Sequence, residues 1–203
     1  MNMATKEVKI NSADLTKLRE LTGAGMMDCK SALVEAGGDL KAAQDVIRKK
    51  GLDIAKKKST REAREGQILS YIHAGGKLGV LVEINCESDF VAKNENFQTF
   101  ARDIAMQIAA GHPLYVSSAD IPPADLEREK SVFLEQVKDK PEPVRSKIID
   151  GKLMKRYEEI CLLNQKFIKD DSRTVQDLLT EFIAKIGENI IIRRFVRFEV
   201  GGN

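Results

Sequence analysis

The sequence predicts an α+β fold, with a three-helix domain at the N-terminus and a core in which a three-stranded antiparallel sheet packs with helices. Residues 11–51 carry three apolar patterns of helical period, each closed by glycine. A hairpin pattern at residues 66–84 and a last strand pattern at residues 190–200 are separated by long helical segments. This order favours antiparallel pairing over regular strand–helix–strand units.

The N-terminal helices have recognisable ends in the sequence. Ser12 is expected to cap the first and Asp39 the third, and Gly51 is expected to end the third. Met26 and Met27 open the second helix, where they are either core filler or a soft contact surface. Their spacing alone leaves both interpretations open.

The segment that follows, RKKGLDIAKKKSTREAR, is strongly basic. It has two interpretations, a nucleic-acid patch and a solvated linker, and we favour the linker because no aromatic residue interleaves the charges to stack on bases. The sequence then divides into a three-helix domain at residues 1–54, a basic linker at residues 55–65 and an α+β core at residues 66–203.

Within the core, period-two patterns predict which strand residues share a face. Alternation is expected to place Val80, Val82 and Ile84 on one side. Between the hairpin and the last strand, Gly151 is expected to separate two helices. In the last strand, the residues expected to point one way are Ile190, Ile192, Val196, Phe198 and Val200.

Composition limits the function classes. Charged residues make up 32% of the 203 residues but nearly cancel to a net charge of +2, so no large field attracts nucleic acid. No apolar run approaches the roughly 20 residues of a membrane span, and the N-terminus lacks the apolar core of a signal peptide. The three cysteines follow no paired pattern, which favours reduced thiols and a cytoplasmic location.

Motifs for enzyme chemistry are missing from the sequence. There is no phosphate loop, dinucleotide fingerprint, zinc-binding HExxH or nucleophile elbow, so we expect no enzyme, no cofactor and no metal site. A dyad of His73 or His112 with Cys86 or Cys161 stays open, although buried structural cysteines are commoner than nucleophiles. The pair Asp170-Asp171 is better explained by a turn than by cation binding.

The run EINCESDFVAKNENFQTF at residues 83–100 changes from strand to loop to helix within a few residues. Ser88, Asp89, Phe90 and Val91 lie at that junction. One interpretation is structural, with Ser88 or Asp89 capping the helix while Phe90 and Val91 tuck under the sheet. The other is an exposed contact site, with a carboxylate beside a large aromatic.

A longer stretch, GKLGVLVEINCESDFVAKNENF, resembles the signature of the bacterial elongation factor Ts family, with Ser88 in place of the usual threonine. The resemblance implies a guanine-nucleotide exchange factor for elongation factor Tu, in which Ser88, Asp89, Phe90 and Val91 help to dislodge the partner's magnesium. It implies binding to both the GDP-bound and the nucleotide-free partner.

The N-terminal segment LRELTGAGMMDCKSALVEAGGD is also similar to that family, whose N-terminal domain has the ubiquitin-associated fold. The resemblance implies that Arg19, Met26 and Met27 contact the partner's nucleotide-binding domain. The chain matches a short member with one hairpin and one returning strand, so we expect a homodimer and a complex of two factors with two partners. A monomer with a smaller footprint is the competing outcome.

Two other function classes remain as alternatives. An RNA-binding or ribosome-associated module would use the basic linker and the basic last strand, and it predicts strongly salt-dependent RNA binding. A ubiquitin-fold adaptor would use only the three-helix domain, which leaves the core without a role. Both rank below nucleotide exchange.

Overall fold

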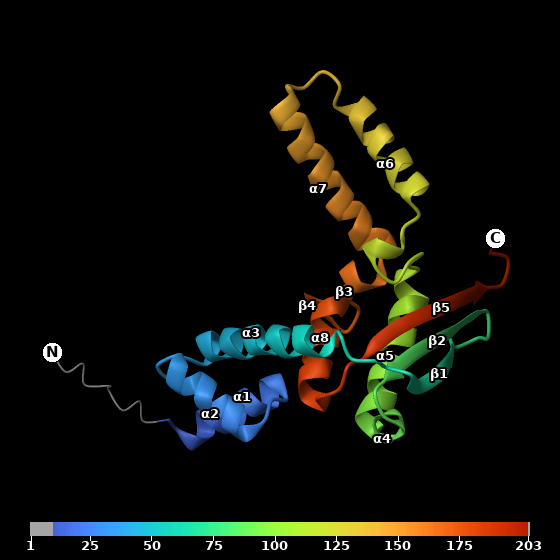
Figure 1. Cartoon of the computed structure of the whole chain (residues 1–203). Helices are drawn as coiled ribbons and strands as arrows, with labels where there is room; N and C mark the ends of the chain where they lie inside the picture. Colours follow the sequence, from blue (N-terminus) through green and yellow to red (C-terminus); the bar gives the residue numbers. More distant parts are fainter. Residues whose placement is uncertain (1–9, 203) are drawn as a thin grey trace. The chain divides into compact units, whose positions relative to one another are not determined.

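The computed structural model describes residues 10–202, which divide into two compact units (Figure 1). The first unit takes the chain up to Ala63 together with Leu179–Ile190, and the second takes Arg64–Leu178 with the residues from Ile191 onward. Helices and an antiparallel sheet occur together, so the predicted α+β fold class is confirmed.

The first unit is built on α1 (Ser12–Thr22), α2 (Met26–Glu35) and α3 (Leu40–Lys58), three helices in the predicted order. Their apolar faces meet in a small core, and partly buried aliphatic side chains close around it. The fully buried members of that core are Leu18, Cys29, Ala32, Leu33 and Ala43.

Side-chain caps begin the first and third helices. Asn11 caps α1, with its side-chain oxygen accepting from Ala13 N at 3.1 Å, so the prediction of Ser12 is wrong by one residue. Asn and Ser are about equally good caps, so propensity does not separate such neighbours. Asp39 caps α3 as predicted, accepting from Ala42 N at 2.7 Å.

Gly51 lies inside α3, so the prediction that it ends this helix is wrong. It is buried, and a Cβ at this position would lie 3.6 Å from the Cβ of Ala184 in α8 (Val175–Ile186). The small residue therefore permits close packing of α3 within the first unit. Because α3 runs on to Lys58, the first residues of the expected linker, 55–58, are helical.

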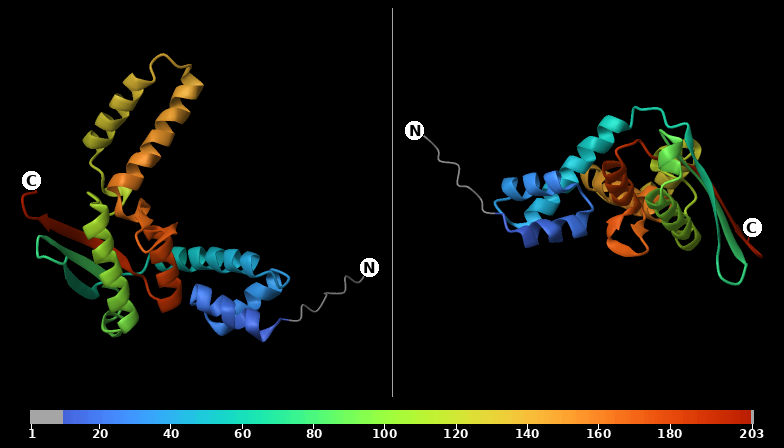
Figure 2. Two further views of the ribbon diagram at one scale, coloured as in Figure 1. Left: turned by 180° about the vertical axis from the view of Figure 1, so that it is seen from behind. Right: turned by 90° about the horizontal axis from the view of Figure 1, so that it is seen from below.

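The second unit contains a three-stranded antiparallel sheet in the order β1-β2-β5. Its strands are β1 (Glu65–Ile72), β2 (Leu78–Cys86) and β5 (Ile191–Glu199). As predicted, Val80, Val82 and Ile84 are buried on one face. That face packs on α5 (Glu95–Gly111), which runs across β1 and β2 (Figure 2).

The second residue of β1 has to be a glycine. Gly66 has φ 138° and pairs with Asn85, and a Cβ there would lie 2.2 Å from the carbonyl oxygen of Ile84. No side chain fits so close to a backbone atom. Gly66 therefore brings the start of β1 against the end of β2, where the chain leaves the sheet for the candidate site.

A β-bulge at Arg193 reverses the face pattern predicted for the last strand. Ile192 pairs with Ile84 and Arg194 pairs with Glu83, so Arg193 is the extra residue. Beyond the bulge Phe195 and Arg197 lie opposite the buried residues of β2, and the even-numbered residues turn outward. The prediction that Val196, Phe198 and Val200 share the face of Ile190 and Ile192 is therefore wrong.

A long helical hairpin follows α5. Helix α6 (Pro123–Gln136) and α7 (Glu142–Ile160) lie side by side and are joined by a short turn (Figure 1). Gly151 lies within α7, an uninterrupted helix, so the prediction that it separates two helices is wrong. A single exposed glycine costs a helix only about 1 kcal/mol, which the flanking turns of α7 tolerate.

Short elements complete the second unit. They are α4 (Asp89–Ala92), the 3₁₀ turns Ser118–Asp120 and Leu162–Asn164, and a second two-stranded sheet of β3 (Lys166–Phe167) and β4 (Asp170–Thr174). The sequence did not predict β3 and β4, which are too short to give a period-two pattern. Within residues 10–202, no helix combines the length and the apolar character needed to span a bilayer.

Candidate partner-binding site

The predicted site is the single helical turn α4, between the end of β2 and the start of α5. Ser88 caps this turn, with its backbone extended and its Oγ accepting from Val91 N at 3.4 Å. Cys86 Sγ, at the end of the buried strand, donates to the carbonyl oxygen of Ser88 at 3.1 Å. A single turn of helix has little stability by itself. These two hydrogen bonds hold the turn against the end of β2.

Phe90 points into solvent from this turn. Its side chain is 82% exposed, the highest value among the large hydrophobic residues of the described chain, 10–202. Val91 is half-buried and Ala92 is buried, so the turn rests on the sheet through its other side. The interpretation in which Phe90 tucks under the sheet is therefore wrong, although Ser88 does act as the cap.

Asp89 lies next to Phe90 and is half-buried, with its side chain 50% exposed. Lys93 Nζ donates to its carboxylate at 2.8 Å, and this hydrogen bond and the ammonium charge lower the pKa of Asp89. The same contact raises the pKa of Lys93. The carboxylate is thus ionised at neutral pH, and water screens the ion pair so that it separates easily.

The predicted N-terminal residues lie on both sides of one connection in the first unit. Arg19 is exposed in the last turn of α1, and Met26 and Met27 begin α2 immediately after the Gly23–Gly25 link. The side chains of Met26 and Met27 are 49% and 74% exposed, and neither contributes to the buried core. The core-filler interpretation of these methionines is therefore wrong.

A sequence model of the family described as elongation factor Ts matches residues 30–201. The chain belongs to the elongation factor Ts family. An elongation factor Ts of Geotalea uraniireducens is 57% identical over 196 residues, which cover 96% of this chain and 91% of that protein. The relative from Geobacter sulfurreducens is 54% identical with the same coverage. One from Caldanaerobacter subterraneus subsp. tengcongensis is 54% identical over 95% of this chain and 97% of that protein.

Membership of the elongation factor Ts family makes this chain a translation elongation factor. The resemblance implies partner contacts for the segment 88–91 and for residues 26 and 27. In the structure each of these residues is exposed or half-buried. They belong to different compact units. The candidate partner contacts therefore form two separate sets, one in each unit.

The cysteines and histidines of this family member do not favour a nucleophilic site. Burial raises the pKa of the Cys161 thiol, which keeps it protonated and unreactive. His112 ends α5 in a left-handed conformation, and His73 Nδ1 is 2.9 Å from the hydroxyl of Tyr71. Among residues 10–202, no cluster of three or more His, Cys, Asp or Glu side chains is arranged to hold a metal ion.

Asp170 takes part in local hydrogen bonds rather than in a cation site. Its Oδ1 accepts from Ser172 N at 3.2 Å and from Ser172 Oγ at 2.6 Å, and these bonds lower the pKa of Asp170. Arg173 Nε lies 3.0 Å from the other carboxylate oxygen. The local hydrogen bonds expected of this segment are thus present, but its backbone belongs to β4, and the turn itself lies just before it at residues 168–169.

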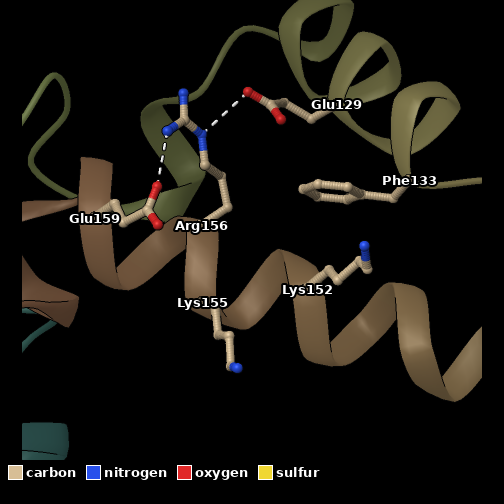
Figure 3. Close-up of a pocket in the computed structure, with 6 residues that line it drawn as sticks. All are labelled: Glu129, Phe133, Lys152, Lys155, Arg156 and Glu159. Atoms are coloured by element: carbon tan, nitrogen blue, oxygen red, sulfur yellow. Dashed lines mark hydrogen bonds and ion pairs between the residues drawn. The ribbon is translucent and has the colours of Figure 1, made fainter. Parts of the chain in front are cut away.

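An open pocket between α6 and α7 is lined mainly by charged side chains, three of which pair with each other (Figure 3). Arg156 bridges Glu129 at 3.1 Å and Glu159 at 2.9 Å, and the bond to Glu159 is the main cause of its raised pKa. Lys152 Nζ lies 5.5 Å from the ring centre of Phe133. These contacts hold the two helices together.

The basic segment of the first unit has a structural explanation. Lys56, Lys57 and Lys58 form the last turn of α3, where cations interact favourably with the helix dipole. The lysines therefore do not require nucleic acid to account for them. This placement counts against the RNA-binding alternative.

Sequence reasoning missed three residues that contact the site, namely Cys86, Lys93 and Gln98. The Gln98 amide nitrogen in α5 donates to the carbonyl oxygen of Ala92, the last residue of α4, at 2.9 Å. A polar residue on a helix gives no sequence signal that its side chain reaches back to the preceding turn.

Proposed function

We propose that this protein binds elongation factor Tu in its GDP-bound state and promotes release of GDP, so that GTP can enter the emptied site. The observation that carries the proposal is the exposure of Phe90 on a capped turn, beside the ionised carboxylate of Asp89. An aromatic side chain held in water on a fixed turn is suited to insertion into a partner's surface.

In this mechanism Phe90 enters between helices of the partner close to its bound magnesium. Asp89 leaves Lys93 and competes for the polar groups that surround the ion, while Ser88 and Val91 hold the turn in shape. The magnesium then dissociates and GDP follows. No covalent chemistry is involved, and the activity is protein binding that changes the partner's affinity for its nucleotide.

Thermodynamic linkage makes this exchange reversible. If the protein weakens GDP binding by some factor, GDP weakens binding of the protein by the same factor. Burial of one phenylalanine stabilises a complex by roughly 1.5–3 kcal/mol, so larger coupling needs contacts elsewhere. We assign the second contact surface to Arg19, Met26 and Met27.

The test is release of a fluorescent GDP analogue from purified elongation factor Tu, at micromolar and at millimolar magnesium. The protein is expected to accelerate release, and Phe90→Ala is expected to remove most of the acceleration. Val132→Ala, which shortens an exposed side chain on α6, serves as the control and is expected to behave like the wild type. Failure of the wild-type protein to accelerate release at either magnesium concentration would refute the proposal.

The N-terminal contacts are tested by how the rate depends on protein concentration. Arg19→Ala and Met27→Ala are expected to raise the concentration that gives half-maximal release and to leave the maximal rate nearly unchanged. Leu52→Ala, on the exposed side of α3, is the matched control. A lower maximal rate with an unchanged half-maximal concentration would contradict the assignment.

We also propose that two copies of the chain pair through the outer face of the β1-β2-β5 sheet. The solvent face of an antiparallel sheet is normally polar, but here it carries exposed apolar side chains. These are Ile68, Ile72, Leu81, Val196 and Phe198. The charges at the β2–β5 pair, Glu83 and Arg194, form a hydrogen-bonded ion pair at 2.6 Å and need no outside partner.

A second copy suits this surface because a two-fold interface is self-complementary. Sedimentation is expected to give a species of twice 22.6 kDa. Leu81→Lys, in the central strand, is expected to give the monomer, and Leu134→Lys on α6 is the matched control, since the two leucines are 45% and 46% exposed. A single species at 22.6 kDa for the wild type would refute pairing.

A further inference from the structure

Gln98 connects three elements of the second unit through one amide group. Its Nε2 donates to the carbonyl oxygen of Ala92 at 2.9 Å and to Oε1 of Gln67 in β1. A side-chain amide has two N–H hydrogens, so these bonds use its full donor capacity. The side chain itself is half-buried between α4, α5 and β1.

The contact closes the end of α4 that Ser88 does not hold. Ser88 and Cys86 fix the N-terminal end of the turn, and Gln98 fixes the carbonyl at its C-terminal end. Phe90 lies between the two points of attachment. With only one helical turn available, the direction of its ring depends on both attachments.

We propose that Gln98 is a positioning residue that holds α4 in the orientation from which Phe90 enters the partner. The inference rests on the function proposed above, and it adds a residue that touches neither nucleotide nor magnesium. A group that is misplaced by about 1 Å loses much of its effect on a reacting centre, so loosening of the turn reduces exchange without removing Phe90.

The sharpest substitution is Gln98→Glu, which keeps the shape of the side chain and removes its donors. An ionised carboxylate accepts hydrogen bonds only, so it cannot bond to the carbonyl oxygen of Ala92, whereas the amide of Gln67 can rotate and donate to it. The variant is expected to lower the maximal rate of GDP release about fivefold to tenfold and to change the half-maximal concentration less than about twofold. Thr99→Ala, at the exposed neighbouring position of α5, is the control and is expected to match the wild type.

A double-mutant cycle separates positioning from a general loss of structure. In the Phe90→Ala background, Gln98→Glu is expected to have almost no further effect, because Gln98 acts through Phe90. An equal effect in both backgrounds, or an unchanged maximal rate for Gln98→Glu alone, would overturn the proposal. Melting temperatures of all variants, taken by circular dichroism, verify that each remains folded.

A second readout is independent of nucleotide exchange. The chain contains no tryptophan, so Phe90→Trp creates a single fluorescent reporter on α4. Adding Gln98→Glu is expected to lower the fluorescence anisotropy of this reporter, because the turn becomes mobile on the nanosecond scale. Unchanged anisotropy would show that Gln98 does not hold the turn. If the wild-type protein does not accelerate GDP release, the proposed function fails, and if Phe90→Ala leaves the acceleration unaffected, the role of Phe90 fails, while in both cases the anisotropy still decides whether Gln98 fixes α4.

Discussion

Gln107→Leu is expected to weaken the second unit by disconnecting α5 from the start of β3. Gln107 is almost fully buried, and its Nε2 donates at 3.1 Å to both Gln165 Oε1 and the carbonyl oxygen of Lys166. Its Oε1 accepts from Ile168 N at 2.8 Å. Leucine fills a similar space but makes none of these bonds.

The size of this loss of stability depends on whether the three former hydrogen-bond partners of Gln107 can bond to water instead. A buried polar group left without a hydrogen bond costs about 1–3 kcal/mol. Gln165 is buried and bears this cost in full, whereas Lys166 and Ile168 are exposed and can bond to water. We therefore expect the free energy of unfolding to fall by about 1–3 kcal/mol.

Urea unfolding, followed by tyrosine fluorescence, measures the stability of the second unit. All three tyrosines, Tyr71, Tyr115 and Tyr157, lie in the second unit, and the chain has no tryptophan to mask them. Gln136→Leu makes the same chemical change at an exposed position of α6 and is expected to change stability by less than about 0.5 kcal/mol. A loss for Gln107→Leu no larger than that of this control would refute the reasoning.

Three further outcomes are expected. Gly151→Ala is expected to raise the free energy of unfolding by about 0.5–1 kcal/mol, because alanine favours the helix more than glycine does. The residue is exposed inside α7, and no atom lies within 4 Å of a new Cβ. A lower urea midpoint, measured by tyrosine fluorescence, would contradict this. Gly111→Ala is expected to cost about 1–3 kcal/mol in the same measurement, because its Cβ would lie 2.3 Å from Gln165 Oε1 and displace that amide; an unchanged midpoint would show that Gln165 adapts freely. Burial raises the pKa of Cys161, so alkylation of this thiol in the native chain, followed by mass spectrometry, is expected to begin at higher pH than in the chain unfolded in urea, and identical pH profiles would contradict this.

The fold class and most helices were predictable because their signals are local. Apolar residues at helical spacing mark α5, and Val80, Val82 and Ile84 alternate in β2 as their burial requires. The faces of β5 were not predictable, since the bulge at Arg193 depends on pairing with β2, which the strand's own residues do not encode. The same holds for Gly51, whose helical setting includes close packing near Ala184.

The candidate site was likewise predictable only in part. The sequence located Ser88–Val91 by motif, but it left open whether Phe90 was buried or exposed, because an aromatic beside a strand end is compatible with both. The structure decides this through contacts that lie outside the motif. The bond from Gln98 to Ala92 joins residues six positions apart across the start of a new helix, where sequence periodicity carries no information about side-chain direction.

In the proposed mechanism the partner contacts are divided between the two units, and this division bears on how GDP would be released. In the mechanism proposed above, insertion of Phe90 alone would stabilise the complex by roughly 1.5–3 kcal/mol, which corresponds to a coupling of about 10- to 150-fold. A tightly held α4 raises the share of that energy available for displacing nucleotide, because less is spent on ordering the turn during binding. The contacts proposed for Arg19, Met26 and Met27 would instead lower the concentration of the protein needed for binding. Exposed methionines suit this role since their flexible side chains adapt to a partner surface. If docking and displacement use these separate surfaces, a substitution in one surface is expected to change its own step and leave the other step unaltered.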